Sequence, residues 1–315
     1  MYISVNPLIA HQAKTSSLRK VKTDALDAYR LCELYYKEEL EPLKKRGEKL
    51  LNLRNVSRQH DAITKLLVQT KLQFQALLDQ IFPEYVGVFG ELYSFVSMQT
   101  LLDFPTAESV SATSKTDLAD QIATRCPSPS KRWARERAEQ LTMAASRNPF
   151  RSALVQSHLF SLEMYIKIIL QYKGHLSQLK RQIDALAQDI EEYQIIQSIP
   201  GIGQKIAATI ISEIGEIDQL NHPRKLVAFA GVDPSVHSAT SNRISKRGSS
   251  RLRHALYEGV SCGLRKTGCN KLKAYYDKKK DKGKPYKVIV VACVNKLIHW
   301  IYALLTNKEL FLDMA

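Results

Sequence analysis

The sequence of 315 residues has few cysteines, and they form no pattern that holds a metal or a disulfide framework. There are five of them, an odd number without any CxxC pair: Cys32, Cys126, Cys262, Cys269 and Cys293. This spacing argues against a zinc site and against a secreted disulfide scaffold, and it fits a reducing cytoplasm. Because no basic segment precedes an apolar run at the N-terminus, we also expect no signal peptide.

The sequence also lacks an uninterrupted apolar run of membrane-spanning length. Its most apolar segment, residues 288–305, is interrupted by Asn295, Lys296 and His299. A membrane-spanning helix needs about 20 mostly apolar residues. We therefore expect this segment to form a buried helix, and we expect no membrane partner.

Acidic residues are too few to balance the basic ones. The 46 Lys and Arg residues exceed the 31 Asp and Glu residues, which gives a formal net charge of +15. An excess of this size favours a polyanionic partner such as nucleic acid. Each basic cluster alone is more typical of a solvated surface, but together they indicate several contact surfaces: residues 44–46, 131–137, 243–253 and 271–287.

Two long segments carry heptad patterns that predict long helices. In the first, Leu53, His60, Leu67, Phe74 and Ile81 recur every seven positions, all but His60 apolar, and Pro83 should end the helix. In the second, an apolar seam continues without a break from Leu162 to Tyr193. The two helices could pair as an antiparallel arm, pair with copies in another subunit, or belong to one core bundle, because all three produce this periodicity.

A glycine-containing turn followed by a helix and a basic loop lies between residues 199 and 248. Pro200, Gly201 and Gly203 permit a tight turn, and the helix containing Lys205 starts with the positive end of its dipole at that turn. Such a helix start favours phosphate, although an isolated turn of this kind is more often an ordinary helix connection. We predict a helix-hairpin-helix, followed by further phosphate contacts: Arg224, Lys225, Arg243, Lys246, Arg247, Arg251 and Arg253.

The lysine-rich run 271–287 contains two adjacent tyrosines, Tyr275 and Tyr276. Aromatic side chains among lysines can stack on nucleic-acid bases. Equally, tyrosines next to a helix commonly anchor a segment to the core.

Two aspartates near the N-terminus, Asp24 and Asp27, lie three residues apart. On a helix this spacing puts both carboxylates on one face, close enough to share a divalent metal. A commoner explanation is that Asp24 caps the helix and that Asp27 stabilises its dipole. Metal-dependent strand chemistry needs further acids, and the pattern alone assigns none.

Together these residues resemble the transposases of the insertion-sequence-110 family, relatives of the Piv-type DNA invertases. The resemblance covers nearly the whole chain and rests on VNPLIAHQAKTSSLRKVKTDALDA, IPGIGQKIAATIISEIG, LVAFAGVDPSV, NRISKRGSSRLRHALYE and KAYYDKKKDKGKPYKV. It implies a RuvC-like α/β domain with four metal-binding acids of the DEDD type, a coiled-coil arm and a C-terminal domain with a nucleophilic serine. It also implies Mg²⁺ as cofactor, DNA and a structured guide RNA as partners, and a homo-oligomer in which the serine attacks DNA covalently.

The resemblance assigns Asp24 and Asp27 to the third and fourth of the four acids. The first two lie upstream of the family's NP motif, which here begins at Asn6, only five residues after Met1. We therefore expect an N-terminally truncated reading frame that keeps only a remnant of the RuvC-like domain.

The resemblance also places the nucleophile near Pro234. Family members carry a serine followed by a glycine about five residues after this proline, and here Ala239 stands at that spacing. Ser238 and Ser241 are the nearest candidates for the nucleophile.

We therefore expect a mostly α-helical chain with four parts: a partial RuvC-like segment at 1–48, a helical region at 49–150, a coiled-coil helix at 151–195 and a C-terminal transposase domain at 196–315. The overall resemblance favours an enzyme that recombines DNA under RNA guidance. The missing acids favour a non-catalytic nucleic-acid-binding remnant. A third alternative is an oligomerisation partner of a full-length transposase.

Overall fold

The computed structural model describes residues 23–37, 47–126, 130–150, 156–238 and 241–313. The NP motif at Asn6, the basic cluster 44–46 and Ala239 lie outside the described residues. The prediction of a mostly α-helical chain is confirmed by the secondary structure, which consists of α2 (Asp24–Lys37), α3 (Glu48–Ile81), η1 (Pro83–Tyr85), α4 (Phe95–Asp103), α5 (Ala107–Ser111), α6 (Lys115–Thr124), α7 (Lys131–Arg147), α8 (Gln156–Gln188), α9 (Glu191–Gln197), α10 (Gln204–Ile214), η3 (Ile217–Gln219), α11 (Pro223–Ala230), β1 (Pro234–Ser238), β2 (Ser241–Ile244), α12 (Ser250–Gly263), α13 (Asn270–Lys280) and α14 (Tyr286–Asn307).

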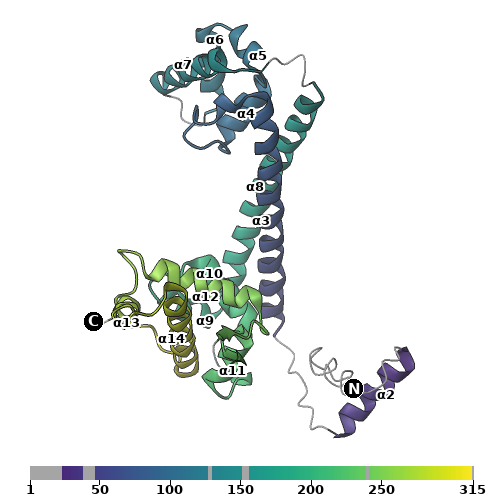
Figure 1. Ribbon diagram of the computed structural model, residues 1–315, viewed down its shortest axis with the longest axis vertical. Helices are drawn as coiled ribbons and strands as arrows, with labels where there is room; N and C mark the ends of the chain where they lie inside the picture. The colour runs from purple at the N-terminus through teal and green to yellow at the C-terminus, as the bar shows by residue number, and fades with distance from the viewer. Residues whose placement is uncertain (1–22, 38–46, 127–129, 151–155, 239–240, 314–315) are drawn as a thin grey trace.

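Two long helices, α3 and α8, lie side by side and form a stalk that joins two lobes (Figure 1). They run in opposite directions, so the chain supplies an antiparallel arm by itself. α3 has 34 residues and is therefore about 50 Å long. It ends at Ile81, just before Pro83, as the sequence predicts, and Pro83 begins a short 3₁₀ helix.

The seam from Leu162 to Tyr193 does not stay in one helix, so the prediction of a single rod is wrong at its C-terminal end. α8 ends at Gln188, and α9 begins at Glu191. Ile190 lies between the two helices and is 7% exposed, and Tyr193 is buried in the same core. The helix breaks here because the last heptad buries its apolar residues in a lobe rather than along the stalk.

Each lobe has its own hydrophobic core, and the stalk helices contribute to both. The upper lobe packs α4 to α7 around the stalk end that carries Phe74 of α3 and Ile166 of α8. The lower lobe packs α9 to α14 around the opposite end, where Leu53 and Ile183 are buried. The stalk therefore fixes the spacing of the lobes through apolar contacts at both of its ends.

Helix α14 confirms the prediction of a buried helix. By length and composition, it is the one described helix that could cross a membrane. Its apolar residues instead fill the lower core: Ile289, Val290, Cys293, Val294, Leu297, Ile298, Ile301 and Leu305.

Residues 234–238 and 241–244 form two antiparallel strands of a hairpin where the sequence predicts a basic loop. Pro234 pairs with Ile244, and Ser235 pairs with Arg243. The strands PSVHS and SNRI are short and mostly polar, and each contains one β-branched apolar residue, Val236 or Ile244. Arg243 therefore belongs to a strand, and the basic loop begins after Ile244.

Candidate nucleic-acid interface

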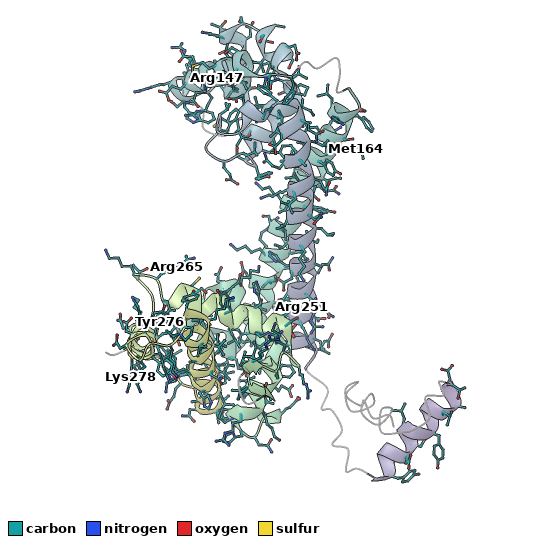
Figure 2. All side chains as sticks on the ribbon, viewed as in Figure 1. Arg147, Met164, Arg251, Arg265, Tyr276 and Lys278 are labelled. Atoms are coloured by element: carbon teal, nitrogen blue, oxygen red, sulfur yellow. The ribbon has the colours of Figure 1, made fainter. Side chains whose placement is uncertain are left out.

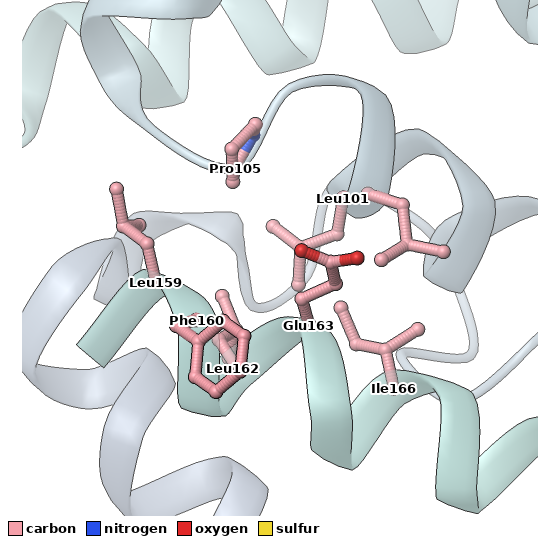
Figure 3. A pocket seen from close by; sticks show the side chains of 8 residues that line it. Leu101, Pro105, Leu159, Phe160, Leu162, Glu163 and Ile166 are labelled. Atoms are coloured by element: carbon pink, nitrogen blue, oxygen red, sulfur yellow. The ribbon is translucent and has the colours of Figure 1, made fainter. Parts of the chain in front are cut away.

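The upper lobe contains a pocket of about 260 Å³ between α4 and α8 (Figure 3). Its walls are almost entirely apolar and include Leu101, Leu162 and Ile166. The only charged group in the lining is Glu163, which pairs with Lys167 on the next turn of α8. This pocket offers neither a nucleophile nor a cluster of cations, so the candidate site lies in the lower lobe.

The predicted turn lies between α9 and α10, and its two glycines have different surroundings. Gly201 has a φ of +98°, and a Cβ there would lie 2.4 Å from the backbone nitrogen of Gly263. Gly201 is therefore needed for packing against α12. Gly203 is exposed and immediately precedes α10, whose first turn has no side-chain cap. The amide end of α10 that could meet a phosphate is thus at Gly203.

A cleft of about 410 Å³ opens beside this helix start, between α10, α12 and the stalk helix α3. Basic side chains from all three helices line it: Lys65 of α3, Lys205 of α10, and Arg251 and His254 of α12. The sequence predicts Lys205 and Arg251 as phosphate contacts, and the structure brings them to one cleft. The sequence analysis does not predict Lys65, because heptad periodicity says nothing about what packs beside a long helix. It does not predict His254 either.

Two carboxylates balance part of the positive charge in this cleft. The Asp61 carboxylate lies 3.8 Å from Lys205 Nζ, and Glu258 lies 3.4 Å from His254 Nε2. Burial alone would raise the pKa of Asp61, but its hydrogen bond with His60 and the charge of Lys205 lower that pKa below its ordinary value. Asp61 therefore stays ionised and holds the Lys205 ammonium at the rim.

Arg251 has an unsatisfied donor in the cleft. Its Nε is buried and has no hydrogen-bond partner among the described residues. Leaving such a donor unpaired costs about 1–3 kcal/mol. An anionic oxygen bound in the cleft is the kind of acceptor that would remove this cost.

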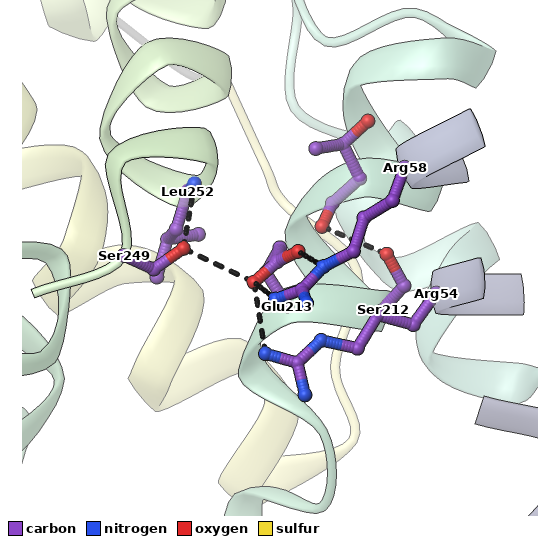
Figure 4. Close-up of polar contacts among 7 residues, drawn as sticks. Arg54, Arg58, Ser212, Glu213, Ser249 and Leu252 are labelled. Carbon is purple, nitrogen blue, oxygen red and sulfur yellow. Dashed lines mark hydrogen bonds and ion pairs between the residues drawn. The ribbon is translucent and has the colours of Figure 1, made fainter. Parts of the chain in front are cut away.

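One buried carboxylate ties the three helices of the cleft together (Figure 4). Glu213 of α10 is 1% exposed and accepts hydrogen bonds from Arg58 Nε at 2.7 Å and Arg54 Nη2 at 3.2 Å. Its Oε2 also accepts from Ser249 Oγ at 3.0 Å, and Ser249 caps α12 by accepting from the Leu252 amide. Burial alone would raise the pKa of Glu213, but the two arginines outweigh this effect and lower it to about 2.

The basic loop 245–249 is held in place by backbone contacts. It runs back along the end of α11 through three amide-to-carbonyl hydrogen bonds: Ser245 to Asp233, Lys246 to Gly231, and Ser249 to Phe229. A Cβ at Gly248 would lie 1.9 Å from the Phe229 carbonyl oxygen. Lys246 and Arg247 therefore project from a fixed backbone, and both are exposed together with Arg243.

The remaining predicted basic residues differ in their surroundings. Arg224 and Lys225 are exposed at the start of α11. Arg253 is partly buried, and its Nη1 donates to the Ala230 carbonyl oxygen at 2.9 Å. Arg253 therefore closes the end of α11, whereas the other two present their charge to solvent.

The two serines proposed as nucleophiles occupy adjoining positions at the end of the hairpin. Ser238 and Ser241 form its last register pair, and residues 239–240 between them lie outside the described residues. The basic loop 245–249 follows directly after the strand that starts at Ser241. Both serine positions therefore lie within a few residues of the basic loop in the sequence.

The structure does not bring the two aspartates together with these serines. Helix α2 lies apart from both lobes (Figure 1), and Asp24 is its exposed first residue. The Oγ1 of Thr23 accepts from the Leu26 amide at 3.4 Å, so Thr23, not Asp24, caps this helix. Asp27 follows three residues later in α2, which puts the two positions on one helix face.

The aspartate pair alone is a small donor set for a metal. Within the described ranges, no group of three or more His, Cys, Asp and Glu side chains could hold a metal ion. Mg²⁺ is commonly held by one or two carboxylates when substrate phosphates and waters complete its octahedron. Asp24 and Asp27 fit this ion only if a phosphate ligand joins them.

Two parts of the chain match models of known protein families. A family model described as "Transposase IS116/IS110/IS902 family" matches residues 193–277, which include most of α9, all of α10 to α12 and most of α13. A second model, a transposase of the IS110 DEDD type, matches residues 1–83. The transposase for insertion sequence element IS1111A of Coxiella burnetii (strain RSA 493 / Nine Mile phase I) is 34% identical over 138 residues.

This alignment covers 42% of the chain and 38% of the Coxiella protein, so the chain spans well under half the length of that relative. The first match includes the cleft residues of α10 and α12 and the basic loop, and the second includes Asp24 and Asp27. On these matches, the chain belongs to the IS110 family of insertion-sequence transposases.

Proposed function

We propose that this chain acts as a DNA-binding transposase whose lower lobe grips the sugar-phosphate backbone. The observation that carries the proposal is the cleft in which Lys65, Lys205, Arg251 and His254 converge from three helices. Phosphate contacts supply most of the sequence-independent affinity of such proteins and fix their register on the nucleic acid. The buried Nε of Arg251 and the uncapped start of α10 are two further donors suited to an anionic oxygen.

The basic loop extends this surface toward the serine positions. Arg243, Lys246 and Arg247 are exposed; Arg243 lies in β2, the strand that starts at Ser241, and Lys246 and Arg247 lie in the loop that follows this strand. Since β2 connects the loop to Ser241, a DNA strand bound by the loop would pass near both serine positions.

The proposed chemistry is transfer of a DNA strand to serine. The Ser238 or Ser241 oxygen would form a new bond to phosphorus, and the deoxyribose oxygen would leave with a proton. Because one phosphodiester bond replaces another, rejoining needs no external energy source. Bound Mg²⁺ would stabilise the charge that develops on the phosphate, and Asp24 and Asp27 would supply part of its ligands.

A structured guide RNA and further copies of the chain belong to the same proposal. Two features support them besides the family resemblance. A second basic surface lies on α13, with Lys278 and Lys280 exposed. Apolar side chains of the stalk are also uncovered, since Leu66 and Leu72 of α3 are 51% and 60% exposed.

Salt-dependent binding tests the DNA contact. Replacing Lys246 and Arg247 with alanine should weaken duplex binding and lower the slope of log K against log salt by about 1.8, or about 0.9 for each phosphate that the variant no longer neutralises. The matched control removes two exposed charges of the upper lobe that lie outside the basic clusters, Lys115 and Arg147, and should leave the slope unchanged. An unaltered slope in the Lys246/Arg247 variant would rule out the loop as a contact surface.

A covalent-adduct assay tests the chemistry. Protein, Mg²⁺, a cognate RNA and the ends of the element would be incubated together, with Ser238→Ala and Ser241→Ala beside the wild type. We expect a DNA-linked protein band that one of the two substitutions abolishes. Retained binding without any adduct would instead identify a non-catalytic nucleic-acid-binding protein.

A further inference from the structure

A second pocket lies in the lower lobe, away from the cleft that contains Arg251. It has a volume of about 420 Å³ and lies where α12, α13 and the start of α14 meet. Figure 2 shows Tyr276 and Lys278 on α13, toward the side of the lobe that carries Arg265 and away from the stalk, where Arg251 lies. The pocket is lined by Ser261, Leu264, Lys273, Tyr276, Asp277 and Tyr286.

Two tyrosines line this pocket, Tyr276 of α13 and Tyr286 of α14, and Tyr257 of α12 lies near Tyr286. Tyr276 is half-buried and packs against the lower core, so it also serves as the anchor that the sequence suggests. Tyr286 of α14 and Tyr257 of α12 are 57% and 46% exposed. The pKa of Tyr286 is raised, chiefly by the charge of Tyr257, then by desolvation, and with a smaller effect of Tyr276. Exposed aromatic rings around a polar pocket provide flat surfaces on which another ring can stack.

The charge around the pocket suits the backbone of a nucleic acid. Lys273 lines the pocket itself, and Lys280, Lys284 and Lys287 are exposed on the adjoining segment. A groove that combines cations with aromatic rings is typical of proteins that bind single strands, because the phosphates meet the lysines while the bases stack. Duplex DNA keeps its bases stacked inside, so only an unpaired base could enter the pocket.

Asp277 gives the pocket a preference among bases. Its carboxylate accepts hydrogen bonds but cannot donate them when ionised. Cytosine offers an N4 amino donor at the position where thymine has the O4 acceptor. A cytosine in the pocket could donate to Asp277, whereas a thymine would place its oxygen against the carboxylate.

We propose that the pocket between α12, α13 and α14 holds one unpaired nucleobase, stacked on the tyrosines and preferably carrying an amino group that faces Asp277. The strand that supplies this base lies with its phosphates along the lysines of α13 and the following loop. This assignment rests on the proposed nucleic-acid-binding function and adds a base-binding site to a surface otherwise suited only to phosphates.

Single-stranded oligonucleotides with equal numbers of phosphates test the site. We would compare oligo-dC, oligo-dT and a fully abasic oligomer by fluorescence anisotropy with the full-length chain. Stacking of one base predicts that oligo-dC binds about 5- to 100-fold more tightly than the abasic strand. Tyr286→Ala should remove most of this advantage without changing the affinity for the abasic strand.

Three control variants separate base binding from backbone binding. Lys280→Ala should weaken all three oligomers by the same factor and lower the salt slope. Tyr29→Ala, which removes a tyrosine that is 68% exposed on α2, should change none of them. Asp277→Asn should abolish the preference for oligo-dC over oligo-dT and leave stacking in place.

Two results would overturn the proposal. Equal affinity for oligo-dC and the abasic strand would show that no base enters the pocket. An equal loss for both strands in Tyr286→Ala would show that the ring supports the fold or the backbone contact. If no oligomer or duplex binds at all, the proposed function itself fails, and this result is distinct from the other two.

Discussion

The buried network around Glu213 makes a quantitative prediction about the lower lobe. Glu213→Gln keeps the size of the side chain but removes the charge that Arg54 and Arg58 face. The ordinary pKa of Glu213 is 4.5 and its folded-state pKa is about 2, a difference equivalent to about 3.5 kcal/mol at about 1.4 kcal/mol per pKa unit. The Arg58 side chain is 37% exposed, and solvent screens part of this interaction. We expect the substitution to destabilise the lower lobe by about 2–3 kcal/mol.

The assay needs a probe confined to that lobe, and the sequence provides one. The chain has two tryptophans, Trp133 in the upper lobe and Trp300 in the lower lobe. In a Trp133→Phe background, the fluorescence of Trp300, whose ring lies 5.2 Å from that of Phe311, reports urea unfolding of the lower lobe alone. The matched control is Glu191→Gln, which removes an exposed ion pair with Lys308 in the same lobe and should cost at most about 1 kcal/mol.

The same variant predicts a pH dependence. Because the pKa of Glu213 is lowered by folding, its stabilising contribution is fully present above about pH 4.5 and disappears as the pH falls toward 2. The difference in unfolding free energy between wild type and Glu213→Gln should therefore shrink across this interval. A Glu213→Gln protein as stable as the Glu191→Gln control, or a difference independent of pH, would refute the reasoning.

Two further predictions concern the same lobe. Gly248→Ala places a Cβ 1.9 Å from the Phe229 carbonyl oxygen, so it should destabilise the lobe by about 1–3 kcal/mol in the Trp300 assay, whereas Gly90→Ala, with no atom within 4 Å of the added Cβ, should not. Burial raises the pKa of the Cys269 and Cys293 thiols to about 11, whereas Cys32 is exposed. At pH 8 iodoacetamide should therefore modify Cys32 in the native protein but modify Cys269 and Cys293 only in urea, as peptide mass spectrometry would detect. Rapid native labelling of either buried thiol would contradict this.

The features that the sequence predicts well depend on local patterns. The heptads and Pro83 indicate where α3 ends, and the apolar spacing of α14 indicates a buried helix, because both signals come from residues within a few turns of each other. The hairpin at 234–244 was missed because its strands are short and rich in serine. Short polar strands carry little periodicity, and their pairing depends on a turn that composition does not reveal.

The sequence predicts only two of the four basic residues that line the cleft, because these residues come from distant parts of the chain. Lys205 follows the glycine turn, and Arg251 follows the basic loop, so the sequence alone suggests that both residues contact phosphate. Lys65 and Asp61 lie in a helix whose heptad pattern suggests only a stalk. No local pattern states that this helix passes beside α10 and α12, and that contact decides which charges meet.

The polar residues of α3 nevertheless indicate that one face of this helix contacts the lower lobe. Arg54, Arg58, Asp61 and Lys65 follow one another at spacings of four, three and four, which places all four on one face of α3. The first two bind Glu213, and the last two line the cleft. Since Glu213 also holds the cap of α12, a shift of the stalk along its axis would change the ion-pair network and the cleft together. The contacts that fix the stalk to the lobe therefore also set the positions of the cations in the proposed phosphate site.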